Sequence, residues 1–157
     1  MSVNFNIRLV RREDADKVLP LCREMFEESD FAKTTEFAFD RSRFEQLMEI
    51  NPSDLYIALL AETEDGDVAG YITVALNYIY TKQPWAVLEC FYVTPKFRKT
   101  AIPRTLAKKM TRALKSTGAV AFFANSISGT SASRTMLNMF RKLGFEETNS
   151  SLKIDLV

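Results

Sequence analysis

Apolar residues recur along this chain with two different periods, and the changes of period predict alternating strands and helices. Residues 5–10 alternate apolar and polar positions, which predicts a strand, and a helical period begins near Glu13. We expect Pro20 to kink this helix in its early turns. After a polar linker, Asp40 is placed to cap a second, short helix that ends at the Asn-Pro pair 51–52.

The middle of the chain predicts an antiparallel hairpin. The run 55–62 is almost continuously apolar, and the pair 65–66 is Asp-Gly, which favours a two-residue hairpin turn. The apolar pattern resumes over 68–80. Beyond a polar break that ends at Pro84, residues 85–93 predict another strand.

The C-terminal half alternates helix and strand. A helical period fills residues 103–117, and residues 119–125 are apolar on both faces, which is typical of a buried parallel strand. A last helix is expected to begin at Ser131 or a neighbour and to end at Gly144. Residues 145–157 then predict a strand pair or one bent strand.

The predicted order of elements is β-α-α-β-β-β-α-β-α-β. Its second half implies a strand, a crossover helix and a parallel strand, so we expect a mixed sheet covered by helices, an α/β fold of three layers. A chain of 157 residues suits a single domain, here 1–157. The sequence contains no internal repeat or low-complexity segment.

Charge divides the chain into two halves, although the net charge is only +1. Residues 12–67 hold sixteen acidic and six basic side chains, whereas residues 68–157 hold thirteen basic and four acidic ones. We therefore expect the C-terminal half to attract anions and the N-terminal half to attract cations.

Basic charge is densest around the start of the helix predicted after residue 102. Residues 94–116 include eight basic side chains and no acidic one. Cations at a helix N-terminus face the positive end of the helix dipole, which is unfavourable unless an anion is present. Pro103 suits the first helical position, but Ile102 offers no capping oxygen, so the amides of 104–105 need an acceptor. The pattern predicts a phosphate-binding site; the alternative is a solvated basic face whose amides bind water.

Composition excludes several kinds of site. The chain has no histidine, which rules out serine–histidine chemistry and argues against catalytic zinc, so we expect no metal. Cys22 and Cys90 fall on an apolar helix face and in a strand, and we expect both to be reduced core residues. No apolar run approaches the ~20 residues of a membrane span, and no signal-peptide pattern opens the chain. These features predict a cytoplasmic protein that does not bind membranes.

The element order, the cationic loop and the Leu-Gly-Phe of 143–145 together resemble the GNAT superfamily of N-acetyltransferases over essentially the whole chain. Residues 92–103 are similar to the family's valine, proline, aromatic and Arg-x-x-Gly-x-Gly/Ala signature. The resemblance implies the GNAT fold and acetyl-coenzyme A as the acetyl donor, with its pyrophosphate on the loop amides. It also implies a pantetheine arm between the fourth and fifth strands, and an amine as the acceptor.

The resemblance assigns cofactor-binding residues to the fourth strand, the loop, the helix after it, the fifth strand and the last helix. They are Phe91, Tyr92, Val93, Arg98, Lys99, Thr100, Ala101, Ile102, Pro103, Arg104, Asn125, Ser133 and Phe140.

The loop departs from the family signature at its glycines. Ala101 and Pro103 replace both of them, and Lys99 stands where a glycine commonly follows the arginine. Proline also removes an amide donor. We expect the side chains of Arg98, Lys99 and Thr100 to contact phosphate instead, and binding to be weaker and more salt-sensitive than with the standard loop.

Acetyl transfer needs a neutral amine, and therefore a base. Glu89 is the only acidic residue between Val68 and Phe145, and it lies four residues before Val93, where some members of the family place a general-base glutamate. In an apolar strand we expect it to be buried with a raised pKa. An ordinary surface glutamate or an ion-pair partner is the alternative.

The proton donor of the family is missing. A tyrosine in the last helix, seven residues after an asparagine, often protonates the leaving thiolate in the family, but Phe140 and Ser133 occupy these positions. Tyr92, Ser126 and Ser128 are candidate replacements. By resemblance, the amide of Phe91 or Tyr92 would polarise the acetyl carbonyl.

Two groups of aromatic residues are candidates for the acceptor site. The first is Tyr78, Tyr80, Trp85 and Phe91, near the hairpin and the fourth strand, with core packing as the alternative. The second is Phe31, Phe37 and Phe39, in the polar linker. We expect this second group to form a lid or an interface, including that of a homodimer.

Acetyl transfer to a protein lysine, a protein N-terminus or a small amine is the main interpretation, and two others compete with it. The first is a non-catalytic relative that binds an acyl-coenzyme A or a protein partner, because the altered loop and the missing tyrosine could abolish turnover. Divergent loops of this kind also resemble small phage-encoded members of the family. The second is nucleic-acid binding, which needs exposed aromatics beside the basic helix. Phe122 and Phe123 belong to a strand expected to be buried, so we expect no nucleic-acid partner.

Overall fold

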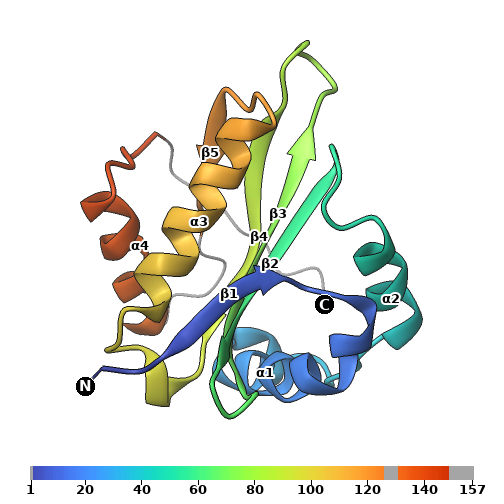
Figure 1. Cartoon of the computed structure of the whole chain (residues 1–157), viewed down its shortest axis with the longest axis vertical. Helices are drawn as coiled ribbons and strands as arrows, with labels where there is room; N and C mark the ends of the chain where they lie inside the picture. Colours follow the sequence, from blue (N-terminus) through green and yellow to red (C-terminus); the bar gives the residue numbers. More distant parts are fainter. Residues whose placement is uncertain (1, 126–130, 149–157) are drawn as a thin grey trace.

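The computed structural model describes residues 2–125 and 131–148, with the side chain of Ser131 left aside. Within these ranges, five strands form one sheet in the order β1-β2-β3-β4-β5 (Figure 1). The strands are β1 Phe5–Leu9, β2 Tyr56–Thr63, β3 Val68–Asn77, β4 Trp85–Val93 and β5 Ala121–Phe123. Strands β1 to β4 pair antiparallel with their neighbours, and β5 is parallel to β4, so the predicted mixed sheet is confirmed. The single domain 1–157 stays a prediction.

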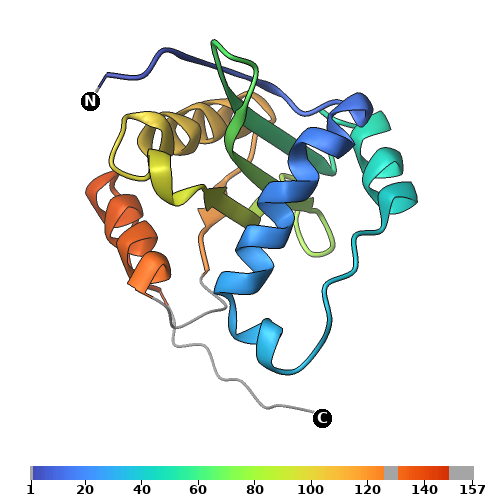
Figure 2. The same cartoon turned by 90° about the horizontal axis from the view of Figure 1, so that it is seen from below.

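Helices cover both faces of this sheet. The α-helices are α1 Ala15–Glu28, α2 Arg41–Glu49, α3 Ile102–Ser116 and α4 Ser131–Lys142, and the short 3-10 turns are η1 Arg12–Asp14, η2 Asp30–Lys33 and η3 Pro95–Phe97. Figure 2 shows α1 and α2 on one side of the sheet and α3 and α4 on the other. Each side has its own buried apolar cluster, so the sheet separates two helical layers.

Side-chain caps and ion pairs explain where the first two helices begin. Oδ1 of Asp40 accepts a hydrogen bond from the amide of Arg43 at 2.9 Å, which confirms Asp40 as the cap of α2. Helix α1 begins at Ala15, slightly later than predicted. The preceding turn η1 ends at Asp14, whose buried carboxylate receives two hydrogen bonds from Arg8, at 2.7 and 2.8 Å.

The hairpin predicted at Asp65-Gly66 is confirmed, but its loop has three residues, 64–66, instead of the expected two, because the turn begins at Thr63, whose carbonyl accepts from the amide of Gly66 at 2.9 Å. Gly66 has a φ of 84°, which other residues adopt only with strain, and the amide of Thr63 donates to the carbonyl of Asp67 at 2.9 Å. Strand β3 is shorter than predicted. It ends at Asn77 because the chain turns away from the sheet there, which leaves Tyr80 85% exposed.

The fifth strand differs from its prediction. It spans Ala121–Phe123 instead of 119–125, and its residues are exposed or half-buried where we expected burial on both faces. The reason is its position at the edge of the sheet, where β4 is its one neighbour among the described strands. Residues 145–148 form no strand, and the rest of the predicted C-terminal strand lies outside the described residues.

Strand β4 carries two irregularities that shape the candidate site. Its register with β3 shifts after Thr73 because Glu89 is an extra residue on β4, which makes a β-bulge. Its parallel ladder with β5 ends at the pair Val87 and Phe123. In the described part of the chain, residues of β4 beyond Val87 therefore have no partner strand on the β5 side.

Candidate functional site

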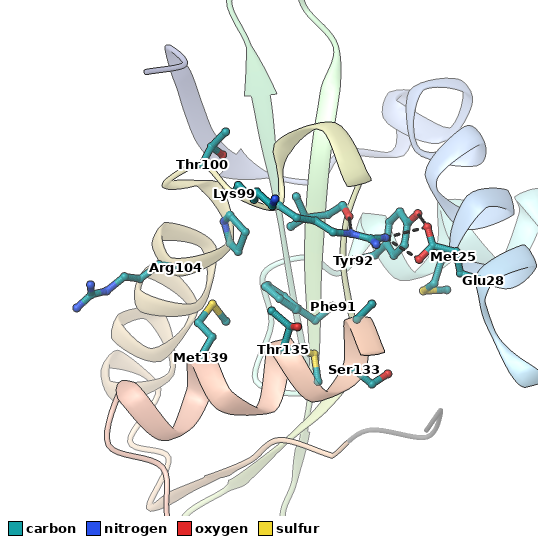
Figure 3. Close-up of a pocket in the computed structure, with 15 residues that line it drawn as sticks. Met25, Glu28, Phe91, Tyr92, Lys99, Thr100, Arg104, Ser133, Thr135 and Met139 are labelled. Carbon is teal, nitrogen blue, oxygen red and sulfur yellow. Dashed lines mark hydrogen bonds and ion pairs between the residues drawn. The ribbon is translucent and has the colours of Figure 1, made fainter. Parts of the chain in front are cut away.

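A cavity of about 510 Å³ lies where β4 has no partner on the β5 side (Figure 3), and we call it the main cavity because most of the residues predicted to bind the cofactor line it. Its walls come from both helical layers, from β4 and from the basic loop. The lining residues are Met25 and Glu28 of α1; Phe91, Tyr92 and Val93 of β4; Arg98, Lys99, Thr100, Pro103 and Arg104 of the loop and α3; and Ala132, Ser133, Thr135, Met136 and Met139 of α4. The interior is therefore mainly apolar, with cations on the side of the loop.

Most of the residues predicted to bind the cofactor line this main cavity. They are Phe91, Tyr92, Val93, Arg98, Lys99, Thr100, Pro103, Arg104 and Ser133. Four others do not line it: Ala101 and Asn125 are exposed, Ile102 is fully buried, and Phe140 is 1% exposed in the core. The ring of Phe140 instead packs against Phe91, with 5.8 Å between centroids, so it supports the cavity wall from behind.

The start of α3 is only partly open to an anion. The helix begins at Ile102, whose amide donates to the hydroxyl of Thr100 at 3.2 Å, and the amide of Thr105 donates to the carbonyl of Ala101 at 3.0 Å. The expectation that Thr105 lacks an acceptor is therefore wrong. The amides of Lys99, Ala101 and Arg104 have no hydrogen-bond acceptor among the described residues, and no acidic side chain lies in the first turn.

Arg98 does not point its charge at an anion site. Its Nε donates to the carbonyl of Val93 at 2.8 Å, and its Nη2 donates to both carboxylate oxygens of Glu28, at 2.8 and 2.7 Å (Figure 3). The hydroxyl of Thr100 likewise donates to the carbonyl of Phe97 at 2.6 Å. Two of the three side chains expected to contact phosphate thus have partners inside the chain.

The cations at the main cavity that have no ion-pair partner within the described ranges are Lys99 and Arg104. Both side chains are exposed, and both border the start of α3. Together with the unpaired amides of the loop, they form the anion-attracting part of the site.

Tyr92 belongs to the same hydrogen-bonded group as Arg98. Its hydroxyl donates to Glu28 at 2.7 Å and lies 3.3 Å from a carboxylate oxygen of Glu24, and its ring lies 5.3 Å from the guanidinium carbon of Arg98. Burial first, and then the hydrogen bond to Glu28, raises the pKa of Tyr92 well above its usual value. The phenol therefore stays protonated at neutral pH.

Glu89 is exposed on the surface of β4, so the expectation that it is buried is wrong. The bulge explains the difference, because an extra residue in a strand leaves the regular alternation of inward and outward side chains. Burial, with a smaller contribution from the charge of Glu89, raises the pKa of both Tyr56 and Cys90 to about 12. Glu89 is not one of the residues that line the main cavity.

The aromatic residues of the polar linker pack within the chain. The ring of Phe37 lies 5.6 Å from that of Phe26, and the rings of Phe39 and Phe44 lie 5.5 Å apart, so both residues fix the linker onto α1 and α2. Phe31 is 46% exposed. Only Phe31 keeps the exposure expected of a lid or interface residue.

The aromatic residues near the hairpin do not form a common wall. Phe91 lines the main cavity, Tyr80 is exposed, and Trp85 packs edge-on against Phe123 at 5.6 Å. Tyr78 is half-buried against the core of the α3–α4 layer. Of these four residues, Phe91 alone lines the main cavity, so it is the one member of the group that can contact a molecule bound there.

Sequence reasoning missed the contribution of α1. Met25 and Glu28 line the main cavity, and Glu24 joins Glu28 at the hydroxyl of Tyr92. The spacing of Glu24 and Glu28 was a usable signal, because residues i and i+4 share one face of a helix. Their partner Tyr92 lies 64 or more residues away in the chain, which local patterns do not reveal.

Three further expectations concern features that the structure describes only in part. No group of three or more metal-ligating side chains occurs in residues 2–125 and 131–148, and no helix there is long and apolar enough to span a membrane. Ser126 and Ser128, the other candidate proton donors, lie outside the described residues.

Solved structures of known proteins share this fold. Ribosomal-protein-alanine N-acetyltransferase from Brucella melitensis biovar Abortus 2308 has a TM-score of 0.73 at 18% identity, over 98% of this chain and 99% of that one. Glucosamine-6-phosphate N-acetyltransferase from Arabidopsis thaliana has a TM-score of 0.74 at 15% identity, over 98% and 99%. AAC(6')-Iy, in complex with the bisubstrate analogue CoA-S-monomethyl-acetylneamine, has a TM-score of 0.72 at 17% identity, over 97% of both chains.

These identities are too low to transfer an activity, and no curated protein matches the sequence. The family model described as "Acetyltransferase (GNAT) family" matches residues 19–145, most of the chain and all of the main cavity's walls. This protein therefore belongs to the GNAT family of acetyltransferases.

Proposed function

We propose that this protein is an N-acetyltransferase that transfers an acetyl group from acetyl-coenzyme A to a primary amine. The observation that carries the proposal is the main cavity, which combines an apolar interior beside β4 with loop amides and two cations that have no partner in residues 2–125 and 131–148. Membership of the GNAT family and the coenzyme A analogue bound by AAC(6')-Iy support the choice of cofactor. A cytoplasmic location is part of the same proposal.

The residues of the main cavity suit the two ends of such a cofactor. The amides of Lys99, Ala101 and Arg104, with the ammonium of Lys99 and the guanidinium of Arg104, would bind the pyrophosphate. Apolar side chains of β4 and α4, including Phe91, Met136 and Met139, would surround the pantetheine arm. Acetyl-coenzyme A would supply an acetyl group activated as a thioester.

Glu89 is the proposed base. Its carboxylate would take a proton from the acceptor ammonium, since a primary amine with a pKa near ~10.4 is almost wholly protonated at neutral pH. The neutral nitrogen would then bond to the acetyl carbon as the carbon–sulfur bond breaks, and the thiolate would leave. The nitrogen would release its second proton to solvent, and the thiolate, whose thiol has a pKa near ~8.5, can take a proton from solvent in turn. Tyr92 would not need to supply that proton, because its hydroxyl already donates to Glu28.

Thermal unfolding with acetyl-coenzyme A tests the cofactor site. We expect acetyl-coenzyme A to raise the Tm more than inorganic polyphosphate at equal charge concentration, because only the former fills the apolar part of the main cavity. Equal shifts would reduce the site to a non-specific basic surface and would contradict the proposal.

Thiol release with a panel of amines tests the enzyme. We expect wild type to release coenzyme A with at least one amine, at a rate that rises with pH. In Glu89→Gln we expect the rate of release at neutral pH to fall at least tenfold and to show no such rise with pH. Glu147→Gln, another exposed glutamate, is the matched control. Specific cofactor binding without turnover for any amine would favour the non-catalytic acyl-coenzyme A-binding module. An unchanged rate in Glu89→Gln would show that the base is wrong.

A further inference from the structure

A second cavity, of about 180 Å³, lies on the other face of the sheet, between α1, α2 and strands β2 to β4. Its lining is made of core side chains, among them Val18 and Cys22 of α1, Phe44 of α2, Ala58 of β2, Tyr71 of β3 and Cys90 of β4. None of its described lining residues carries a formal charge at neutral pH, because burial raises the pKa of both Cys22 and Cys90. The second cavity is therefore apolar with a few hydroxyl and thiol groups.

The size of the second cavity gives it room for a small apolar molecule. Protein interiors are packed at the density of organic crystals, and voids larger than a water molecule are few. An apolar cavity of about 150 Å³ holds a molecule of benzene. The second cavity is of similar size, and its half-buried lining residues Cys22, Phe44 and Cys90 leave it partly open to solvent, from which such a molecule can enter.

The second cavity meets the main cavity at the unpaired part of β4. Cys90 lines the second cavity and the next residue, Phe91, lines the main one. Met25 lines the main cavity, and its sulfur lies 3.1 Å from the thiol of Cys90 and 3.8 Å from the hydroxyl of Tyr71. The two cavities are thus separated by Met25 and Cys90, and an unbranched methionine side chain moves aside more readily than a rigid one.

Of the carboxylates near this junction, Glu28 pairs with Arg98 and Glu24 lies 3.3 Å from the hydroxyl of Tyr92, whereas Glu89 has no ion-pair partner among the described residues. Glu89 precedes Cys90 in the chain, and its charge reaches Tyr56 and Cys90, which both line the second cavity. It is exposed, so an incoming cation can pair with it without losing all of its hydration. An uncharged hollow, with an exposed carboxylate that has no ion-pair partner in the described ranges and directly precedes the lining residue Cys90, fits a molecule with one cationic end and one apolar end.

We propose that the second cavity binds the apolar part of the acceptor, and that this acceptor is a small primary amine with one apolar group about the size of benzene. Its amino group would pair with Glu89 beside the unpaired part of β4. Polyamines and amino sugars do not fit, since burying their additional charged or hydroxyl groups in an uncharged cavity would cost more than it gains. The assignment of this molecule as an acceptor rests on the proposed function; its binding in the cavity does not.

Two cavity-filling variants test the proposal with 2-phenylethylamine as the probe. Ala58→Val and Cys22→Leu each place extra methyl groups in the second cavity. The control is Ala113→Val, the same alanine-to-valine change at a half-buried position of α3 on the other face of the sheet. We expect 2-phenylethylamine to raise the Tm of wild type and of Ala113→Val but not of the filled variants. A filled variant that does not fold is replaced by the other.

Turnover separates this proposal from the proposed function. With acetyl-coenzyme A, we expect the KM for 2-phenylethylamine to rise at least tenfold in the filled variants, while their Tm shift with acetyl-coenzyme A stays unchanged. If spermidine or a lysine peptide is acetylated and 2-phenylethylamine neither binds nor reacts, the acceptor class is wrong and the proposed function stands. If no amine reacts, the proposed function fails, and the Tm shifts with 2-phenylethylamine alone decide whether the cavity binds apolar amines.

The acyl group of the donor is the other molecule that could reach the second cavity. Butyryl-coenzyme A distinguishes the two cases, because a longer acyl chain would need the same space. If wild type prefers butyryl- to acetyl-coenzyme A and Ala58→Val loses that preference, the cavity holds the acyl chain and the proposal is overturned. We expect acetyl-coenzyme A to remain the better donor.

Discussion

Arg98 is surrounded by three groups that each hold its guanidinium in place. The carbonyl of Val93 and the carboxylate of Glu28 accept its hydrogen bonds, and the ring of Tyr92 lies beneath it. Glu28 also accepts the hydroxyl proton of Tyr92, so one carboxylate satisfies two side chains of the main cavity wall. The positive charge of Arg98 is therefore balanced within the chain, and Lys99 provides charge toward solvent at the loop.

Replacing Glu28 tests this arrangement at the residue scale. We expect Glu28→Gln to lower the free energy of unfolding by about 1 kcal/mol, since the pair with Arg98 is partly exposed. The same change should tighten binding of coenzyme A several-fold, because it frees a cation at the main cavity. Chemical denaturation and calorimetric titration measure the two effects. Glu27→Gln, on an exposed neighbour in α1, should change neither, and weaker cofactor binding in Glu28→Gln would contradict the prediction.

Strand β4 brings the parts of the site together at the scale of elements. Its bulge places Glu89 on the surface, its ladder with β5 stops at Val87, and its last residues line the main cavity. On its other edge it approaches β3 closely: a Cβ added at Gly70 would lie 2.7 Å from the carbonyl oxygen of Tyr92 and 2.8 Å from a methyl carbon of Val93. The position of β4 therefore depends on a glycine in its neighbour.

Gly70→Ala is the test of this dependence. The added methyl group must push Tyr92 and Val93 away from β3, so we expect a loss of about 1–3 kcal/mol in the free energy of unfolding and weaker binding of coenzyme A. Adding Val93→Ala removes one of the two contacts and should restore part of the stability. Denaturation curves of the single and double variants measure this, and a Gly70→Ala protein as stable as wild type would refute it.

Charge and cavities are both distributed over the whole molecule. The two halves of the chain carry opposite net charge, and the sheet has a cavity on each of its faces, with the main cavity bordered by the basic loop. Arg98 and Thr100 have partners inside the chain, so the loop depends on exposed cations and on amides to bind an anion. Exposed charges are screened by salt more strongly than buried ones.

Cofactor affinity should therefore depend strongly on ionic strength. We expect the Kd for coenzyme A to rise at least tenfold between 50 and 500 mM salt, because a Debye length near ~10 Å at 0.1 M shrinks as salt is added. Lys99→Ala should weaken binding about 3- to 10-fold and reduce this salt dependence, whereas Lys82→Ala, an exposed lysine between β3 and β4, should do neither. A Kd indifferent to salt would contradict the prediction.

The elements that sequence patterns predicted best are those whose cause is local. The cap at Asp40, the position of the hairpin at Asp65-Gly66 and the helical period of α3 each depend on residues a few positions apart, and all three are confirmed. The least accurate predictions concern β5 and Glu89. Whether β5 is buried depends on what covers the edge of the sheet, and the bulge at Glu89 depends on the register between β4 and β3. A short stretch of sequence determines neither of these.

For the candidate site, the sequence predicted where most of the residues lie but not which side chains they contact. The loop and the strand before it were identified from the sequence, and most of the predicted residues line the main cavity. The partners within it were not identified, because Glu28 and Arg98 are 70 residues apart and Phe140 joins the core through residues distant in the chain, such as Phe91.

The sequence by itself determined the order of elements as far as α4, the mixed sheet and the position of the anion-attracting loop, since each of these follows from short-range periodicity, turn chemistry and charge; the family was indicated by the resemblance of its motifs. The tertiary structure alone decided which cations stay unpaired, where Glu89 points and that two cavities meet at β4. These features arise from side chains that meet only after the sheet has formed and the two helical layers have packed onto it.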